Sequence, residues 1–422
     1  MWRALIVMLT LSTSASAGGL AGAWQGTWTK SGDALRVVVT FQRSGAGYTG
    51  TFDSDALQVA EIPFAQVTEN SDRVHFALTG DASTIVFDGS QRADAIDGTF
   101  VDGAAKGTFH LARTTAAAPL RSRDVTFDNG DVKLAGTLLV PDGAGRHPAI
   151  VFLHGSGPEQ RFANRWLAQR FARVGFVALI YDKRGAGAST GDWKTADFTE
   201  LAGDAVAGVR LLRTLPEVDA KRVGISGHSQ GGTIAPLVAV RAGDLAFVIA
   251  SAAGGIDPAR MEEYSLGNSI GIAALPTGEA TDARAFVHAI VDVAYRGHAR
   301  SELDALAAKL KGRSWYFDPP PADNFYWAFS RRIASYRPAD SWRQVKAPVL
   351  VLFGDKDERV PPKSDADAIV QALRAGGNRN VVVKTFPNAD HTFALPAANG
   401  AWPRHVADYA DVMIDWAKHA LH

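Results

Sequence analysis

The segment "VGISGHSQGGTIAP", Val223–Pro236, places a serine between two glycines where one sequence pattern gives way to another. The residues before the turn favour a β-strand, and those after it favour a helix. Gly227 and Gly231 flank the three residues His-Ser-Gln and remove the Cβ clashes that a sharp strand-to-helix turn would cause. Such a turn lifts the hydroxyl of Ser229 above the edge of a sheet, where it is free to attack a carbonyl group.

The chain around this turn alternates buried strands with amphipathic helices. Six apolar runs are predicted strands: "AIVFLH", "FVALIYD", "RVGISG", "LAFVIAS", "PVLVLFGD" and "NVVVKTFP". Helical segments such as "RWLAQRFARV" separate them, so we predict a mostly parallel sheet with helices on both faces. Between Ile256 and about Asp340 the alternation stops, and we expect a helical cap over the carboxyl ends of the strands.

Residues 22–113 follow a different pattern of short alternating runs, which Gly, Asp and Asn separate. This pattern predicts antiparallel strands joined by tight turns, and thus a small all-β barrel or sandwich domain. Thr114–Leu120, "TTAAAPL", has the composition of a linker. We therefore predict a second domain, with an α/β fold, over residues 121–422.

The first 17 residues have the features of a bacterial signal peptide. Arg3 precedes the apolar run Ala4–Leu11, and Ala15-Ser16-Ala17 fits the A-x-A cleavage pattern. The run is shorter than the roughly 20 residues that span a bilayer. We predict cleavage after Ala17 and a secreted or periplasmic protein, with a buried first helix or an uncleaved anchor as alternatives.

The composition limits the classes of function. The 422 residues include 44 Lys plus Arg and 44 Asp plus Glu, and this balance gives no support to a nucleic-acid partner. The sequence contains no cysteine, which excludes disulfides, thiolate metal sites and a thiol nucleophile.

A serine hydroxyl needs a base and a group that orients the base. Downstream of Ser229, one predicted strand ends in "GDKDERVPP" and the next in "FPNADHTF", which supply Asp355, Asp357 and His391. We predict His391 as the base and Asp357 as its orienting acid, because the loop must pass the strand end before a carboxylate can reach an imidazole. Asp355 remains the alternative, and Asp390 is expected to cap its own loop.

An oxyanion site needs two backbone N–H groups. The helix after Ser229 directs its N-terminal amides at the site, and we assign one donor to the amide of Gln230. The loop "VFLHGSGPEQ" supplies the other, which we assign to Ser156, with Gly157 as its rival. We expect His154 to brace this loop rather than to act as a base.

Five motifs follow one another in the sequence: "HGSGP", "YDKRGAGASTGDW", "GISGHSQGG", "GDKDERVPP" and "NADHTF". They stand in the order seen in the α/β-hydrolase superfamily, which the chain resembles from about Arg121 onward. It is most similar to the exported bacterial branch that includes esterases and BAAT C-terminal and serine aminopeptidase-like proteins with an N-terminal β-domain. The resemblance implies a structural turn at Asp182, Arg184 and Gly185. It also implies hydrolysis through an acyl-enzyme, without a metal or organic cofactor.

The sequence is compatible with three functions, of which the first is favoured. The first is a carboxylesterase for small to medium acyl esters, because acyl-CoA is scarce outside the cell; its partner would be a small-molecule ester. The second is an aminopeptidase-like or thioester-cleaving enzyme, with Glu262 and Glu263 as candidate anchors for an amine. The third is an inert binding protein that uses Trp24 and Trp28. Aromatic residues within Arg313–Arg332 either line a substrate pocket or pack the cap.

Overall fold

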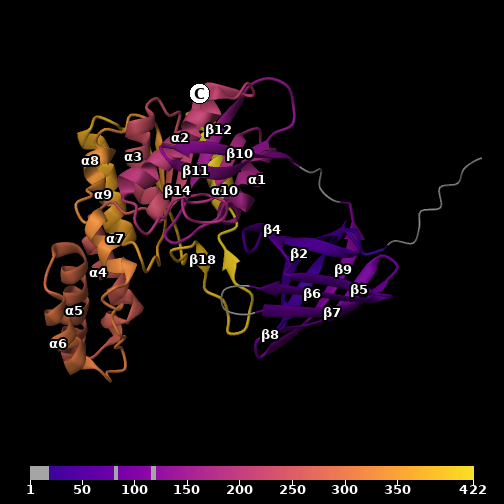
Figure 1. Cartoon of the computed structure of the whole chain (residues 1–422), viewed down its shortest axis with the longest axis horizontal. Helices are drawn as coiled ribbons and strands as arrows, with labels where there is room; N and C mark the ends of the chain where they lie inside the picture. The colour runs from indigo at the N-terminus through magenta and orange to yellow at the C-terminus, as the bar shows by residue number, and fades with distance from the viewer. Residues whose placement is uncertain (1–18, 80–83, 116–119) are drawn as a thin grey trace, which may run out of the picture. The chain divides into compact units, whose positions relative to one another are not determined.

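The computed structural model describes residues 19–79, 84–115 and 120–422, which form two compact units (Figure 1). The predicted signal peptide and most of the predicted linker lie outside these residues. Among the described residues, the first unit comprises 19–54, 61–115 and Asn399–Trp402, and the second comprises 55–60, 120–398 and Pro403–His422. Each unit therefore includes a short segment from a distant part of the chain.

The first unit is one antiparallel sheet of nine strands in the order β4-β3-β2-β1-β9-β8-β7-β6-β5. Its strands are β1 (Gly22–Lys30), β2 (Asp33–Ser44), β3 (Gly47–Ser54), β4 (Val59–Pro63), β5 (Gln66–Asn70), β6 (Arg73–Thr79), β7 (Thr84–Arg92), β8 (Ala95–Asp102) and β9 (Ala105–Thr114). The sheet curls, because the amide of Phe64 donates to the carbonyl of Gly50 in β3 and the next amide donates to Ala77 in β6. It is a half-barrel, so of the two predicted forms the sandwich is excluded.

Aromatic side chains fill the inside of this half-barrel. The ring of Trp28 lies 5.0 Å from that of Phe52 and 4.5 Å from that of Phe87. Trp402, from the segment near the C-terminus, donates its indole N–H to the carbonyl of Trp28 over 3.0 Å and lies 5.7 Å from the ring of Phe100. Trp28 is 1% exposed, so its side chain packs the core.

The second unit contains an eight-stranded sheet in the order β10-β11-β13-β12-β14-β15-β16-β17. Its strands are β10 (Arg121–Asn129), β11 (Val132–Val140), β12 (His147–Leu153), β13 (Val177–Tyr181), β14 (Val218–His228), β15 (Val248–Ser251), β16 (Val349–Gly354) and β17 (Val381–Phe386). The hairpin β10–β11 is antiparallel and β11 pairs antiparallel with β13, whereas all the other pairs are parallel. The predicted mostly parallel sheet is thus confirmed.

Helices cover both faces of this sheet. Alternate residues of β12 face opposite sides, so Val151 belongs to one apolar cluster and Ile150 and Phe152 to the other. The first cluster includes residues of α2 (Phe198–Thr214), α3 (Gln230–Ala242) and α9 (Pro362–Ala375). The second includes residues of α1 (Arg165–Arg173), which follows η1 (Arg161–Asn164), and of α10 (Tyr409–Ala420). Among the described residues, no helix combines the length and apolarity needed to cross a membrane.

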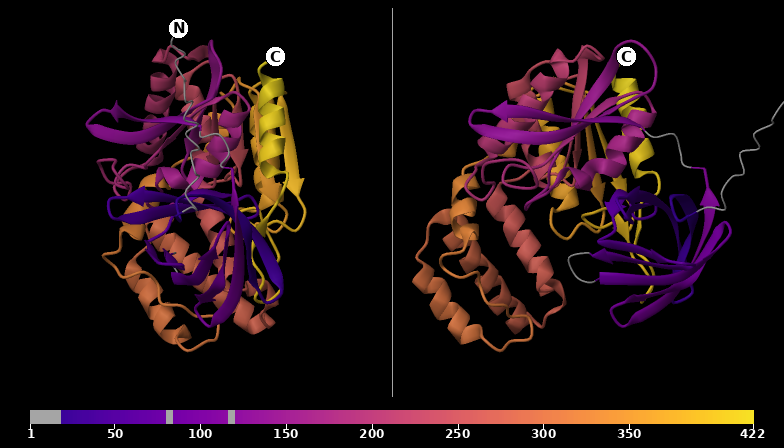
Figure 2. Two further views of the ribbon diagram at one scale, coloured as in Figure 1. Left: turned by 90° about the vertical axis from the view of Figure 1, so that its right-hand side faces the viewer. Right: turned by 45° about the vertical axis from the view of Figure 1, so that its right-hand side comes forward.

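A helical cap is inserted between β15 and β16, as predicted. It comprises α4 (Pro258–Ser269), η2 (Ile272–Ala274), α5 (Thr277–Val291), η3 (Asp292–Arg296), α6 (Arg300–Leu310), α7 (Phe325–Ile333) and α8 (Pro338–Trp342). Helices α4, α5 and α6 form a group beyond the end of the sheet (Figure 2). The cap has its own apolar core, in which the ring of Phe286 lies 5.3 Å from Tyr316 and 5.4 Å from Phe317. Of the two alternatives given for the aromatic residues of Arg313–Arg332, Tyr316 and Phe317 therefore follow the second and pack the cap.

Candidate active site

Ser229 occupies the sharp turn between β14 and α3. Its φ of 54° and ψ of −119° lie in a region that residues other than glycine rarely adopt. A Cβ atom on Gly231 would lie 2.7 Å from the carbonyl oxygen of His154, and one on Gly227 would overlap the backbone of Gly231. The close approach of neighbouring chain therefore requires both glycines, as the sequence predicts, and leaves Ser229 half-exposed.

The structure brings Ser229, His391 and Asp357 together. The Nε2 atom of His391 lies 2.9 Å from the Oγ atom of Ser229. The Nδ1 atom of the same ring lies 2.9 Å from Oδ2 and 3.0 Å from Oδ1 of Asp357. His391 is 5% exposed and Asp357 is 1% exposed, so their contact is shielded from water, whereas the contact with Ser229 is partly exposed. The imidazole thus connects a hydroxyl to a carboxylate at hydrogen-bonding distance on both sides.

The two aspartates after β16 have different partners. Asp357 faces His391 and also accepts two backbone amides of its own loop, each over 2.8 Å. Asp355 instead accepts the amide of Asn388 over 2.7 Å and ties that loop down. Asp390 accepts the amides of the residues two and four positions later, as expected of a loop cap. Of these carboxylates, Asp357 is the one in contact with the imidazole.

Three backbone amides, at the start of α3 and in the loop after β12, are available as donors. Among the described residues, no hydrogen bond uses the amide of Gln230, Ser156 or Gly157. Gln230 is the first residue of α3, so its N–H lies at the positive end of a helix. The amide of Gly155 already donates to the Oε2 atom of Glu159 over 2.7 Å. Two candidates in the loop after β12, Ser156 and Gly157, therefore remain.

Two further histidines lie close to the site and are uncharged near neutral pH. Burial lowers the pKa of His154 to about 3, and its Nε2 atom lies 2.5 Å from the carbonyl oxygen of Tyr181. This contact agrees with the expected bracing role. Burial, followed by the proximity of His391, also lowers the pKa of His228 to about 3, and the two rings are 5.1 Å apart.

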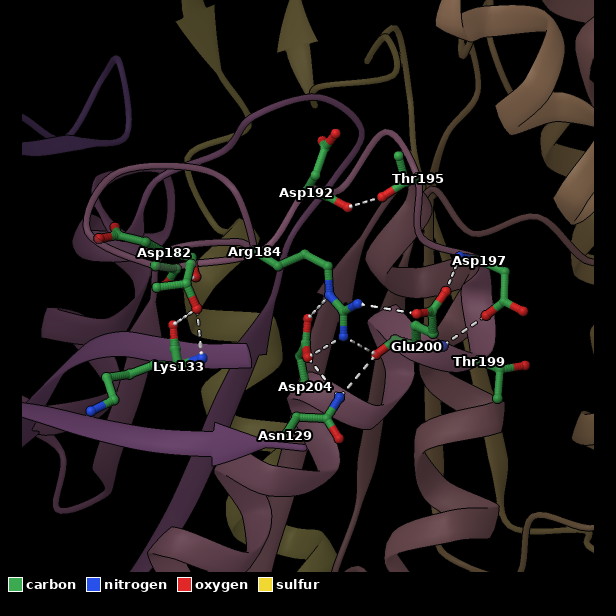
Figure 3. A network of polar contacts seen from close by, with 12 residues as sticks. Asn129, Lys133, Asp182, Arg184, Asp192, Thr195, Asp197, Thr199, Glu200 and Asp204 are labelled. Carbon is green, nitrogen blue, oxygen red and sulfur yellow. Dashed lines mark hydrogen bonds and ion pairs between the residues drawn. The ribbon is translucent and has the colours of Figure 1, made fainter. Parts of the chain in front are cut away.

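The turn after β13 is held by buried ion pairs (Figure 3). The guanidinium of Arg184 makes two 2.7 Å contacts with Asp204 and donates to the carbonyl of Glu200 over 3.1 Å. Burial acts against this charge, but the pairing with Asp204 prevails and raises the pKa of Arg184. Asp182 makes a similar two-point contact with Arg161. These contacts fit the structural role that the family resemblance implies for the turn.

Two residues near the site were missed by the sequence reasoning. The ammonium of Lys183 donates to the carbonyl of Gly155 over 2.7 Å and to the Oε1 atom of Gln230 over 2.6 Å. The only signal in the sequence is its position directly after a predicted strand. Tyr264 in the cap donates its hydroxyl to the carbonyl of Asp357 over 2.8 Å, and nothing in the sequence indicates this contact.

The two glutamates considered as amine anchors already have partners. Glu263 lies 2.9 Å from Arg296 and 3.0 Å from His288. Glu262 accepts the hydroxyl of Tyr326 over 2.8 Å, and burial raises its pKa. Among the described residues, no group of three or more His, Asp or Glu side chains is arranged to hold a metal ion.

Comparison with known proteins decides the family. The family model for serine aminopeptidases, S33, matches residues 145–395, which is more than half of the chain. The chain belongs to the serine aminopeptidase S33 family. This S33 domain contains β12 through β17, the cap, and the contacts among Ser229, Asp357 and His391.

Curated relatives of this S33 member share part of its length. It is 24% identical over 308 residues to the esterase EstD of Thermotoga maritima, covering 71% of this chain and 66% of that protein. It is 32% identical over 123 residues to the quorum-quenching protein AidA of Acinetobacter baumannii, covering 29% of this chain and 40% of the relative. The chain thus spans less than two thirds of either relative.

The chain is also similar to solved structures of other proteins. The esterase Pf2001 of Pyrococcus furiosus is 17% identical, with a TM-score of 0.43, and the match covers 73% of this chain and 95% of that one. The α/β hydrolase GrgF from Penicillium is 19% identical, with a TM-score of 0.48 and coverages of 72% and 99%. Family membership and the sheet order together confirm the predicted α/β-hydrolase superfamily and fold.

Proposed function

We propose that this protein is a serine carboxylesterase that cleaves esters of small to medium acyl groups through an acyl-enzyme. The observation that carries the proposal is the pair of contacts made by His391, 2.9 Å to the hydroxyl of Ser229 and 2.9 Å to the carboxylate of Asp357. The similarity to proteins named as esterases supports the choice of substrate.

The proposed reaction has two halves. Ser229 Oγ attacks the ester carbonyl carbon while His391 Nε2 takes the hydroxyl proton. The negative oxygen that forms would be stabilised by the amide of Gln230 and by that of Ser156 or Gly157. His391 then gives its proton to the leaving alcohol, which leaves an acyl group on Ser229. In the second half, a water molecule gives a proton to His391 and attacks the acyl carbon. His391 then returns that proton to Ser229 Oγ as the bond to Oγ breaks and the carboxylic acid leaves.

The role proposed for Asp357 follows from its surroundings. Its carboxylate accepts from Nδ1 of His391, which leaves Nε2 without a proton and facing Ser229. The same carboxylate balances the positive charge that the ring gains during attack. Because Asp357 also accepts two backbone amides, the ring is oriented before substrate binds.

An amide or thioester substrate is the main alternative, because the same chemistry serves all three bonds and the family is named for an aminopeptidase. A free acidic group near the site would favour an aminopeptidase. Glu263 is already paired with Arg296, and Glu262 accepts a hydrogen bond from Tyr326, so both carboxylates already have partners. These contacts favour the ester over the peptide substrate.

A substrate panel tests the proposal. The purified protein would be assayed with p-nitrophenyl acetate and butyrate, aminoacyl arylamides and acyl thioesters. We expect ester turnover to be fastest and to vanish in Ser229→Ala, together with labelling by a fluorophosphonate. Ser364→Ala, an exposed serine on α9, is the matched control and should retain both signals. Inactivity of the wild type across all esters would contradict the proposal.

We also propose that the protein is exported, on the basis of Arg3, the run Ala4–Leu11 and the small residues up to Ala17. The test is N-terminal sequencing of the protein recovered from a bacterial periplasm or medium. A mature chain that begins at Gly18 is the expected result. Full-length protein confined to the cytoplasm would contradict it.

A further inference from the structure

The backbone of Gly155 is held on both sides by a pair of opposite charges. Its amide donates to the carboxylate of Glu159 over 2.7 Å, and its carbonyl accepts from the ammonium of Lys183 over 2.7 Å. Gly155 is followed directly by Ser156 and Gly157, the two candidate donors for an oxyanion. Anything that fixes Gly155 therefore also sets the position of the next amide along the loop.

The same ammonium reaches the other side of the site. Lys183 donates to the side-chain oxygen of Gln230 over 2.6 Å, and the amide of Gln230 is the other candidate donor. One cation thus joins two segments that lie 28 and 47 residues from it in sequence. These segments are the ones that would supply the two halves of an oxyanion site.

Lys183 itself is held firmly. Its neighbour Arg184 makes a two-point ion pair with Asp204 (Figure 3). Its other neighbour, Asp182, makes one with Arg161, and the amide of Lys183 donates to the carbonyl of Glu159 over 3.0 Å. The side chain is 3% exposed. A buried ammonium is costly unless it is well paired, and an apolar side chain of similar size is often as stabilising. A role in the reaction accounts for a charge at this place better than stability does.

We propose that Lys183 is a positioning residue, which in its ammonium form sets the spacing between the two oxyanion-binding amides. This inference rests on the proposed function and deepens it. Lys183 does not touch the reacting atoms; it acts through Gly155 and Gln230. Loss of its charge would weaken both hydrogen bonds, because a charged donor binds about twice as strongly as a neutral one.

The charge of Lys183 should titrate near pH 8. Burial lowers the pKa of Lys183 to about 8, while the carboxylates of Glu159 and Asp204 oppose this shift. The other groups that face it are the uncharged ring of His154 and the indole of Trp193, whose centre lies 5.5 Å from the ammonium. We therefore expect kcat to fall as pH rises through about 8.

The main test compares Lys183→Met with Lys194→Met. Lys194 is an exposed lysine whose ammonium lies 5.9 Å from the same Trp193 ring, and its side chain has no contact with Gly155 or Gln230 among the described residues. With active sites counted by fluorophosphonate, Lys183→Met should lower kcat about 100-fold and leave KM within about threefold. Lys194→Met should change neither. A folded Lys183→Met protein with kcat within threefold of wild type would overturn the proposal.

A second measurement distinguishes a loss of oxyanion binding from a loss of folded protein. A trifluoromethyl ketone mimics the tetrahedral intermediate, so its affinity should drop about 100-fold in Lys183→Met, in parallel with kcat. Lys183→Arg keeps the charge, and its fall in kcat should move well above pH 8. If Lys183→Met does not fold, the pH dependence of kcat of the wild type decides. A fall in kcat near pH 8 supports the proposal, and a constant kcat from pH 7 to 10 overturns it.

Failure of the esterase proposal can be told apart from failure of this one. The rate of fluorophosphonate labelling requires Ser229 and an oxyanion site but no ester substrate. A wild type that cleaves no ester, yet is labelled about 100-fold faster than Lys183→Met, would refute the proposed substrate and support the role of Lys183. Equal labelling rates in the two folded proteins would refute that role.

Discussion

Asp357 holds His391 through both carboxylate oxygens, 2.9 and 3.0 Å from Nδ1, although 34 residues separate the two in sequence. The carboxylate is 1% exposed and is itself fixed by two backbone amides. Asp355, two residues earlier, faces away and accepts the amide of Asn388. Two neighbouring acids therefore have separate tasks, and substitution can distinguish them.

Asp357→Asn should lower kcat on p-nitrophenyl butyrate by about 10⁴-fold, because an amide in this place favours the wrong tautomer of His391. Asp355→Asn should leave kcat within about threefold. Steady-state kinetics on both proteins checks the pair, with circular dichroism as the control for folding. The assignment fails if Asp355→Asn is the more damaged enzyme.

Gly231→Ala should destabilise the protein by about 3 kcal/mol, because the added Cβ would lie 2.7 Å from the backbone of His154 and neither segment can easily move. Gly278→Ala is the control: Gly278 lies in α5, and no atom lies within 4 Å of its added Cβ. It should stabilise the protein by up to about 1 kcal/mol. Thermal unfolding measures both changes. Similar melting temperatures for the two variants would count against a crowded turn.

Arg184→Met should cost about 3 to 5 kcal/mol in the free energy of unfolding, because it leaves Asp204 buried and unpaired. The double variant Arg184→Met/Asp204→Leu removes both charges and should be less destabilised than Arg184→Met alone. Urea unfolding gives all the values. A double variant whose loss equals the sum of the two single losses would argue against coupling of this pair.

Asp365 should make stability depend on pH. The side chain is fully buried; Oδ1 accepts the amides of Gly255 and Ile256, while Oδ2 has no hydrogen-bond partner among the described residues. Burial raises its pKa from 3.8 to about 6, with Asp357 adding to the shift and Arg260 opposing it. Between these values the folded state binds more protons than the unfolded state. Stability should therefore fall as pH rises from about 4 to 6.

The size of this effect is at most about 3 kcal/mol, at 1.36 kcal/mol for each unit of pKa difference. Urea unfolding of wild type and Asp365→Asn at pH 4, 5, 6 and 7 checks it, because asparagine does not titrate. The stability of the wild type relative to Asp365→Asn should decline over this range. A constant difference at all four values would refute the shift.

The contacts of Ser229 could be predicted because each partner follows a Val-rich strand of the sheet, the buried β16 or the partly exposed edge strand β17. Such strands leave a clear apolar pattern, and the carboxyl ends of parallel strands meet at one edge of a sheet. The choice of Asp357 over Asp355 followed from loop length alone. Lys183 could not be found this way. Its contacts with Gly155 and Gln230 depend on how three segments meet in space, and no periodic pattern in the sequence indicates such a meeting.

The first unit shows a similar limit. Alternating residues identify strands and their inward faces, but a sandwich and a half-barrel have the same alternation. The difference lies in how the two sides of the sheet are joined: the amide of Phe64 donates to Gly50 in β3, and the amide of Ala65 donates to Ala77 in β6. In the cap, the aromatic residues of the sequence predict that their own side chains are buried, but not which residues they contact. Tyr316 and Phe317 pack on Phe286 in α5, which lies 30 and 31 positions earlier in the sequence.

Trp402 has a practical consequence for anyone who divides this polypeptide. Its indole fills space beside Phe100 and satisfies the carbonyl of Trp28, and the ammonium of Lys30 lies 4.1 Å from its ring centre. A fragment truncated at residue 115 would lack this side chain, so its β-sheet would carry a void and an unmet hydrogen-bond acceptor. The complete core of the half-barrel therefore requires residues from two separate parts of the sequence.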